Sequence, residues 1–204
     1  VGGALIGLSS YIPTYLEGSI GATPLVAGLA LAALSIGWPV AATFAGRLYL
    51  RYGFRTTALV GSFFVVVGTV VLALFGMQPS VIIVAITCFI TGFGFGWANV
   101  PSLIAAQSSV GWSQRGVVTG GNMFARSIGS AVGAAIFGAV ANGIIATHGG
   151  NENDPATVTL ASTGVFIGIA ITGVLIVLAI VSMPKTPVTA STPAPSAGAD
   201  AIAG

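Results

Sequence analysis

The sequence predicts an all-α integral membrane protein with six transmembrane helices. Only 5% of its 204 residues are charged, whereas soluble domains have about 25%, and 55% are apolar. The apolar residues lie in six long runs separated by short polar turns. These runs are too long and too little alternating for barrel strands, and open strands would leave backbone groups unsatisfied in lipid. Each run is therefore expected to be a helix.

The six runs differ in length, and the last five are long enough to cross a hydrocarbon core about 30 Å thick. We place the spans at about 1–16, 25–45, 57–76, 81–106, 117–146 and 160–183. The first run looks clipped, because apolar sequence starts at Val1 without a charged segment before it, and we expect the chain to be incomplete at its amino-terminal end. The segment 185–204, rich in Pro, Ala, Ser and Thr, is expected to be a disordered tail after one six-span unit, 1–184.

Charged residues outside the runs separate into two sets at alternate turns. The turns after the even-numbered spans carry Arg47, Arg51, Arg55, Arg115 and Lys185, and those after the odd-numbered spans carry Glu17, Glu152 and Asp154. The positive-inside rule places the basic turns and the tail in the cytoplasm. We therefore expect a multi-pass protein of the cell (plasma or inner) membrane with a cytoplasmic carboxyl terminus.

The fifth span contains Arg126, the charge that lies deepest in an apolar run. Insertion scales assign about 2.5–3.5 kcal/mol to an arginine near the centre of a membrane helix, so this side chain needs a partner or a wet cavity. At 100° per residue it shares one narrow face with Arg115, Asn122, Gly129 and Gly133, and glycines spaced by four let another helix approach closely. Arg126 either bonds carbonyls or headgroups on a packing helix or serves a function in the interior, and we favour the second interpretation.

The first and fourth spans carry further polar and aromatic residues. Tyr11 and Tyr15 share a face of the first span, which suits either an interfacial aromatic belt or a binding site. Our candidates for a substrate cavity are Tyr11, Tyr15, Trp97, Asn99, Asn122 and Arg126. Our candidates for close helix packing are Gly92, Gly96, Gly129 and Gly133. The third and sixth spans are dominated by Val, Ile and Leu. The residue composition of the spans therefore repeats every three spans, which is compatible with an inverted 3+3 repeat.

Clusters that could carry metal or enzyme chemistry are not found in the sequence. Cys88 is a single cysteine inside an apolar run, and His148 has no second ligand-type residue at a helical spacing. We therefore expect no metal, no cofactor and no enzyme activity. The net charge of +2 comes from too few residues to suggest a nucleic-acid partner.

The turn between the second and third runs reads GRLYLRYGFR. It resembles the G-x-L-a-D-r-x-G-r-k signature that lies between the second and third helices of each half in the major facilitator superfamily. The matching residues are Gly46, Leu48, Arg51, Gly53 and Arg55, whereas Leu50 stands at the aspartate position. Residues 11–28 and 107–138 resemble the late portion of the 14-span drug:proton antiporter branch of that family.

This resemblance implies the last six helices of a transporter, which form one half of the fold. In such a half the first and fourth helices line the central cavity, the second and fifth face the other half, and the third and sixth face lipid. The implied function is export of drugs or amphiphilic small molecules by proton antiport with alternating access, in the lipid bilayer and together with a missing amino-terminal half. The six runs contain no Asp, Glu, His or Lys, so we expect coupling carboxylates outside this chain. A facilitator of a neutral solute and a non-transporting truncated module remain alternatives.

Overall fold

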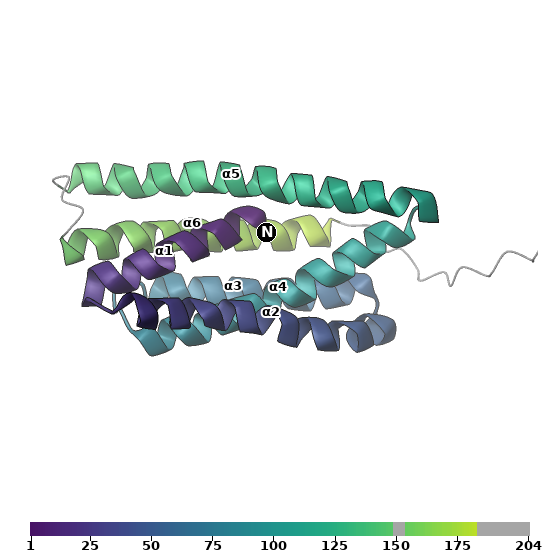
Figure 1. The fold of residues 1–204 in the computed structure, drawn as a ribbon, viewed down its shortest axis with the longest axis horizontal. Helices are drawn as coiled ribbons and strands as arrows, with labels where there is room; N and C mark the ends of the chain where they lie inside the picture. The colour runs from purple at the N-terminus through teal and green to yellow at the C-terminus, as the bar shows by residue number, and fades with distance from the viewer. Residues whose placement is uncertain (149–153, 183–204) are drawn as a thin grey trace, which may run out of the picture.

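The computed structural model describes residues 1–148 and 154–182, and the regular structure in these residues is entirely helical (Figure 1). The helices are α1 (Gly2–Ile20), α2 (Pro24–Tyr52), α3 (Phe54–Leu74), α4 (Val81–Ser108), the 3₁₀ turn η1 (Trp112–Gln114), α5 (Arg115–Thr147) and α6 (Pro155–Val181). Within the described residues, the five helices α2 to α6 are long and apolar enough to cross a membrane. The prediction of a six-helix, all-α membrane fold is confirmed.

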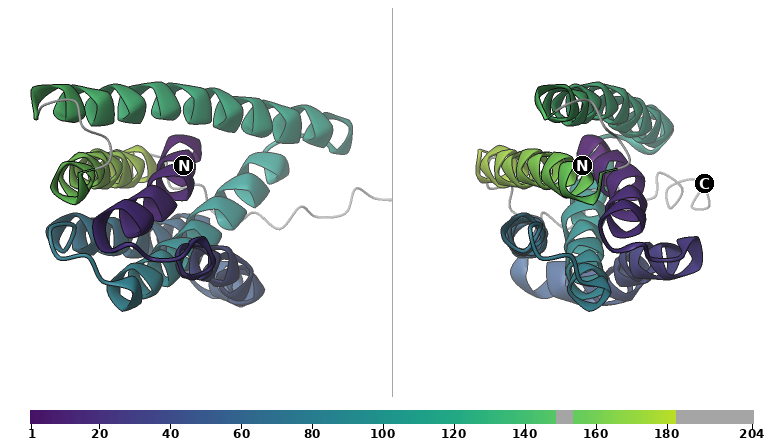
Figure 2. Two further views of the ribbon diagram at one scale, coloured as in Figure 1. Left: turned by 60° about the vertical axis from the view of Figure 1, so that its left-hand side comes forward. Right: turned by 90° about the vertical axis from the view of Figure 1, so that its left-hand side faces the viewer.

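The six helices run alternately up and down, so successive connections lie at opposite ends of the bundle (Figures 1 and 2). α1 packs against α5 and α6, α4 packs against α2 and α3, and α3 packs against α6. Replacing each of the first three helices by its counterpart among the last three maps this set of contacts onto itself. The helix contacts therefore have the pairing that a 3+3 repeat requires.

α6 begins five residues earlier than the apolar run that predicted it. The Asp154 carboxylate caps the helix by accepting a hydrogen bond from the backbone N–H of Thr157 at 3.0 Å, and Pro155 occupies the first turn. These start signals are polar, so a boundary drawn from hydropathy alone falls too late. Residues 149–153 of the predicted outer loop, Lys185 and the predicted tail lie outside the described residues.

α2 extends beyond its apolar run to Tyr52 and ends at Gly53, whose φ of 84° is a conformation that favours glycine. Arg47 and Arg51 therefore lie on the helix, and most of the segment predicted as a turn is helical. Arg55 lies in the first turn of α3, and its Nη2 donates a hydrogen bond to the carbonyl of Val181 at 2.6 Å. Arg55 thus ties the start of α3 to the end of α6.

The core of the bundle is centred on α1. Residues three or four apart on α1 are almost fully buried: Ala4, Leu8, Ile12, Tyr15 and Leu16. They belong to one cluster with Phe137 of α5 and with Phe166 and Ile169 of α6. Buried threonine hydroxyls such as those of Thr69 and Thr91 are satisfied inside their own helices, where each donates to the carbonyl four residues earlier at 2.7–2.8 Å. The core therefore brings few polar groups that need partners from other helices.

Glycines let α4 approach α2 at backbone distance. Gly92 faces the backbone of Leu34, and a Cβ atom placed on Gly96 would lie 2.6 Å from the carbonyl oxygen of Trp38. Such a separation is too short for a side chain, so both positions need glycine at this helix spacing.

The contact between α5 and α1 is built in the same way. Gly133 of α5 lies against Gly3 of α1, and a Cβ atom on Gly3 would lie 2.9 Å from the carbonyl oxygen of Gly129. The two glycine contacts join counterpart helix pairs, α1–α5 and α4–α2.

Candidate functional site

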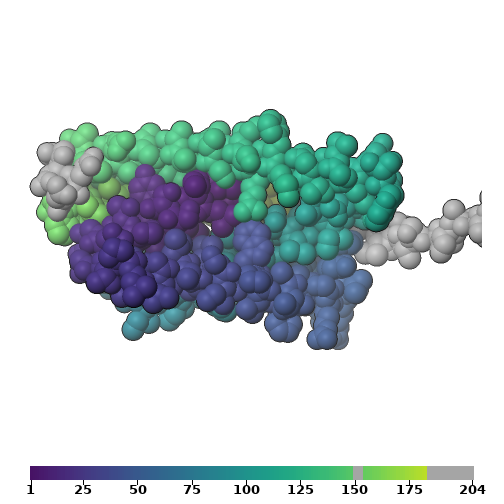
Figure 3. Space-filling view, viewed as in Figure 1, coloured from purple at the N-terminus to yellow at the C-terminus, as the bar shows by residue number. Residues whose placement is uncertain are grey.

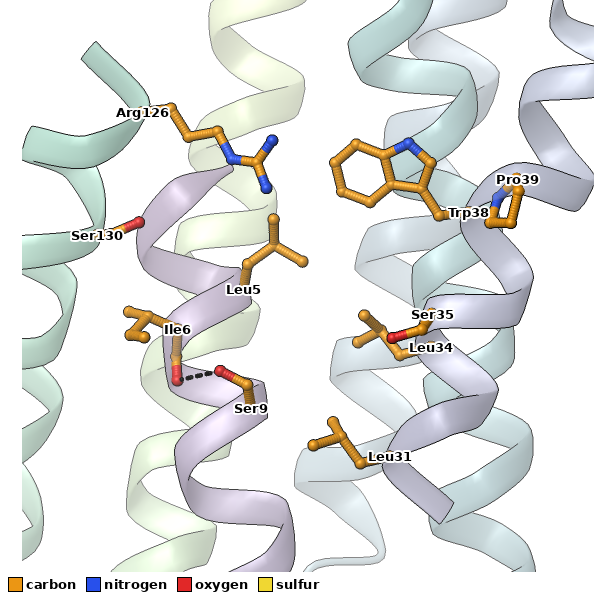
Figure 4. A pocket seen from close by; sticks show the side chains of 10 residues that line it. All are labelled: Leu5, Ile6, Ser9, Leu31, Leu34, Ser35, Trp38, Pro39, Arg126 and Ser130. Carbon is orange, nitrogen blue, oxygen red and sulfur yellow. Dashed lines mark hydrogen bonds between the residues drawn. The ribbon is translucent and has the colours of Figure 1, made fainter. Parts of the chain in front are cut away.

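A pocket of about 490 Å³ lies between α1, α2 and α5, and we call it the Arg126 pocket (Figure 4). Its volume falls in the range of about 300–1,000 Å³ that is usual for small-molecule sites. The space-filling view shows a hollow where the α1 and α2 segments meet α5 (Figure 3). The lining residues are Leu5, Ile6, Ser9, Leu31, Leu34, Ser35, Trp38, Pro39, Arg126 and Ser130.

One face of α2 forms a large part of the pocket wall. Leu31, Leu34, Ser35 and Trp38 follow one another at i, i+3, i+4 and i+7, so all four lie on a single helical stripe. Sequence reasoning missed these residues, because the second run carries no charge and looked mixed in composition. The spacing of three residues between Ser35 and Trp38 was a signal in the sequence that could have indicated this stripe.

Two prolines each remove one backbone hydrogen bond from a helix beside the pocket. Pro39 interrupts α2 and Pro13 interrupts α1, and neither has an N–H to donate to the carbonyl four residues earlier. The carbonyls concerned belong to Ser35 and Ser9, which both line the pocket. Pro13 and Pro39 therefore leave these two carbonyls without their usual helical hydrogen bond, in residues next to the pocket.

Arg126 and Trp38 face each other across the pocket. The guanidinium carbon of Arg126 lies 5.2 Å from the centre of the Trp38 ring, within the range of a cation–π contact, which contributes about 0.5–2 kcal/mol (Figure 4). The contact joins α5 to α2, two helices that are not among the closely packed pairs. It recovers only part of the cost of placing an arginine at membrane depth.

Neither acidic side chain that the structure describes lies near Arg126. Gly2 of α1 lies beside the Arg126 backbone, and Glu17 follows about 22 Å further along the same helix. Asp154 caps α6 at that same distant end of the bundle (Figure 1). Within residues 1–148 and 154–182, Arg126 therefore has an aromatic partner and no carboxylate partner.

Two of the predicted cavity residues lie close to Arg126. Asn99 of α4 and Asn122 of α5 line a smaller pocket of about 230 Å³ together with Arg126 and the start of α1. Arg126 thus borders both pockets. The structure brings the two amides and the guanidinium together at one level of the bundle.

Tyr15, a predicted cavity residue, lies in the core of the bundle and is not among the residues that line the Arg126 pocket. Its side chain is 1% exposed, its hydroxyl donates to the Gly76 carbonyl at 2.8 Å, and its ring meets the edge of Phe166 at 5.2 Å. The stripe of α1 that carries Tyr15 faces the core. Tyr11 lies on another face and lines a separate pocket of about 240 Å³ with Asn142 and Ser162.

Trp97 is also placed away from the Arg126 pocket. Its indole N–H donates to the Ala41 carbonyl at 2.8 Å, and its ring packs with Phe64 and Phe93 between α3 and α4. It borders an apolar pocket of about 280 Å³ near the α2–α3 turn. The hydrogen bond occupies the one polar group of Trp97, so its position is explained by helix packing.

Residues 1–134 match the family model of the Major Facilitator Superfamily. Multidrug transporter protein MdtP of Bacillus subtilis is 25% identical over 138 residues, which cover 68% of this chain and 26% of that protein. Multidrug resistance protein 3 of Bacillus subtilis is 29% identical over 141 residues, 68% of this chain and 27% of that protein. Multidrug efflux pump SdrM of Staphylococcus aureus is 25% identical over 166 residues, 80% of this chain and 36% of that protein.

The match covers most of this chain but a minor part of each relative. The chain spans about a quarter to a third of the length of the curated relatives that it matches. The matched segment includes α1 to α4 and the first part of α5, so it contains every residue that lines the Arg126 pocket.

Proposed function

The chain belongs to the major facilitator superfamily, and we propose that it forms one six-helix part of a membrane transporter that exports drugs or other amphiphilic small molecules by proton antiport. The observation that carries this proposal is the Arg126 pocket, which has the size of a small-molecule site and combines apolar walls with a few polar groups. The names of three relatives, which refer to multidrug transport, resistance and efflux, support the substrate class.

In this proposal the Arg126 pocket is the part of the substrate cavity that this chain supplies. Trp38 and the leucines of α2 would contact the apolar body of the substrate, and Arg126 its polar group. Asn99 and Asn122 extend the polar surface next to Arg126. Rocking of this six-helix unit against a second unit would then expose the pocket to one side of the membrane at a time.

The proposed second unit is a further bundle of helices of the same protein, which would cover the faces that α2 and α5 leave open. Large apolar side chains stand exposed along α5, which lies at the edge of the bundle (Figure 2): Val117, Met123, Phe124, Ile128, Val132 and Ile136. The greater length of the relatives supports a second unit. We assign the coupling carboxylates to it, because the one Asp or Glu within the described helices, Glu17, lies exposed in the last turn of α1.

We propose a cytoplasmic-membrane location with the carboxyl terminus in the cytoplasm. Arg51 near the end of α2, Arg55 at the start of α3 and Arg115 at the start of α5 lie at one end of the bundle. Glu17 and Asp154 lie at the other end. Since basic residues favour the cytoplasmic side, this separation supports the orientation.

A facilitator of a neutral solute is the second candidate function. It is favoured because proton coupling needs a group that titrates within the membrane, and the one Asp or Glu in the described helices, Glu17, lies exposed near the end of α1. The two functions differ in their energy requirement. Export against a gradient stops when a protonophore collapses the proton gradient, whereas facilitated flux continues down its own gradient.

The test is efflux from cells that produce the full-length gene product, with a panel of anionic, neutral and cationic amphiphilic dyes. Protonophore-sensitive efflux of any dye supports the proposal, and Arg126→Ala is expected to abolish efflux of the anionic dyes. Flux that is insensitive to the protonophore would favour the facilitator. Absence of efflux for every dye, with the protein present in the membrane, would contradict both functions for amphiphiles.

A further inference from the structure

The Arg126 pocket has a charge that nothing described in the protein balances. Arg126 is the charged residue among its lining residues, and the others are leucines, an isoleucine, a proline, a tryptophan and serines (Figure 4). The guanidinium lies over the neutral indole of Trp38. The pocket is therefore electropositive at one point and apolar around it.

A charge in such a place selects for the charge of a ligand. The surrounding protein and lipid screen less than water, so the guanidinium attracts an anion and repels a cation more strongly than it would on a surface. Its planar fork of N–H groups matches a carboxylate, sulfonate or phosphate, which it can bind through two parallel hydrogen bonds. A cationic ligand would meet no compensating carboxylate in the described part of the pocket.

The other walls define the rest of the ligand. Leu31 and Leu34 offer apolar contact along α2, and the Trp38 ring offers a flat face that suits an aromatic group. Ser9 and Ser35 add polar residues to the α1 and α2 walls. The pocket is large enough for a bulky organic molecule with one charged end.

From this arrangement we infer that the Arg126 pocket binds amphiphiles that carry a negative charge, with the anionic group on Arg126 and the apolar body against Trp38 and the α2 leucines. This inference rests on the proposed function, because it names the substrate class of the same pocket. It goes further by assigning the charge preference to one side chain. Arg126 is then the residue that determines specificity in this part of the cavity.

Two xanthene dyes of opposite charge provide the test, since fluorescein is anionic and rhodamine 123 is cationic. Their binding to the purified full-length gene product in nanodiscs of phosphatidylcholine is measured by fluorescence anisotropy. Wild-type protein is expected to bind fluorescein more tightly than rhodamine 123. Arg126→Gln is expected to weaken fluorescein binding by about tenfold or more, the loss that corresponds to one charge-assisted hydrogen bond, without weakening rhodamine binding.

Two further variants separate charge from folding. Arg126→Lys keeps the charge but loses the fork, so it should bind fluorescein with intermediate affinity. Arg115→Gln is the matched control, because Arg115 lies 4.9 Å from the ring centre of Trp112 in a similar cation–π pair outside the pocket. It should bind both dyes as wild type does. The elution profile on size exclusion shows whether each variant is folded.

Several outcomes would overturn the inference. Binding of neither dye, tighter binding of rhodamine 123, or an equal loss of both dyes in Arg126→Gln would exclude a charge-selecting role. Loss of fluorescein binding when phosphatidylglycerol is added to the nanodiscs would assign Arg126 to a lipid headgroup instead. If fluorescein does not bind but Arg126→Gln still exports neutral or cationic dyes, the proposed function stands and this inference fails. If fluorescein binds through Arg126 but no dye is exported, the binding preference stands and the proposed export function fails.

Discussion

The guanidinium group of Arg126 lies over the indole ring of Trp38, 5.2 Å from its centre, and this pair joins α5 to α2 across the candidate pocket. The two helices are not closely packed elsewhere, so the contact depends on the two side chains and not on the backbone. A ligand that enters the pocket meets both groups at once. The pair therefore gives the pocket both its charge and its aromatic wall.

Trp38→Leu should weaken binding of fluorescein by about two- to thirtyfold, which corresponds to the loss of one cation–π or stacking contact. Trp38→Phe keeps an aromatic ring and should lose less. Trp112→Leu is the matched control, because Trp112 is 83% exposed and pairs with Arg115 outside the pocket. Fluorescence anisotropy measures all three affinities, and equal losses for Trp38→Leu and Trp112→Leu would contradict the assignment.

Tyr15→Phe should lower the free energy of unfolding by about 0.5–1.5 kcal/mol, because it leaves the buried carbonyl of Gly76 without its hydrogen bond. Transport should be unchanged, since Tyr15 faces the core. Thermal unfolding in detergent measures the stability, with Tyr11→Phe for comparison. A loss of transport in Tyr15→Phe at normal stability would instead support a role for Tyr15 in the substrate cavity.

Gly92→Ala should destabilise the bundle by about 1–3 kcal/mol, because the new methyl group would collide with the backbone of Leu34 in α2. Gly28→Ala is the matched control on α2, where a Cβ atom meets nothing within 4 Å. It should stabilise the helix by about 0.5–1 kcal/mol. Thermal unfolding of the two variants should therefore shift in opposite directions, and shifts of the same sign would refute the close approach of α2 and α4.

Asp154→Ala should lower the melting temperature at pH 7, because it removes the cap of α6. Hydrogen bonds from the Thr157 hydroxyl and backbone N–H hold the pKa of the Asp154 carboxyl below its usual 3.8. A lowered pKa means that the charged form stabilises the fold above pH 3.8, and that this contribution disappears as the pH falls through the folded pKa.

The difference in melting temperature between wild type and Asp154→Ala should therefore become smaller below pH 3.8, because a protonated Asp154 keeps only a neutral capping oxygen. Asp154→Asn keeps a capping oxygen but has no group that titrates. The cap should therefore make no pH-dependent contribution to the melting temperature of this variant. A constant difference between wild type and Asp154→Ala from pH 7 to pH 3 would show that the charge of Asp154 does not contribute.

Hydropathy was enough to predict the helices, because long apolar runs in a bilayer have few other structures open to them. The same signal misplaced the ends of α2 and α6, where the start and stop depend on Asp154 and Gly53 and not on apolarity. The sequence also singled out Arg126, since an interior charge stands out against its surroundings.

The partners of Arg126 could not be predicted in the same way. Trp38 faces it only because α1, α2 and α5 meet at this level, and no spacing within one helix encodes that meeting. Tyr15 and Trp97 lie outside the Arg126 pocket, and the sequence could not show this, because an aromatic residue with a polar atom gives the same pattern in a core and in a cavity. The hydrogen bonds to Gly76 and Ala41 that distinguish the two cases come from other helices.

The most direct test of the Arg126 pocket as a water-filled substrate site is cysteine labelling of two neighbouring residues of α2 in the full-length gene product. Ser35 lines the pocket, whereas Ile36 is 57% exposed on another face, and the native Cys88 is buried and should give little background. A membrane-impermeant maleimide should label Ser35→Cys, and fluorescein should slow that labelling. Ile36→Cys should remain unlabelled, because in the membrane its face of α2 would be covered by lipid or by the second unit and not by water. Equal labelling of the two variants, or labelling of Ser35→Cys that fluorescein does not slow, would contradict the account.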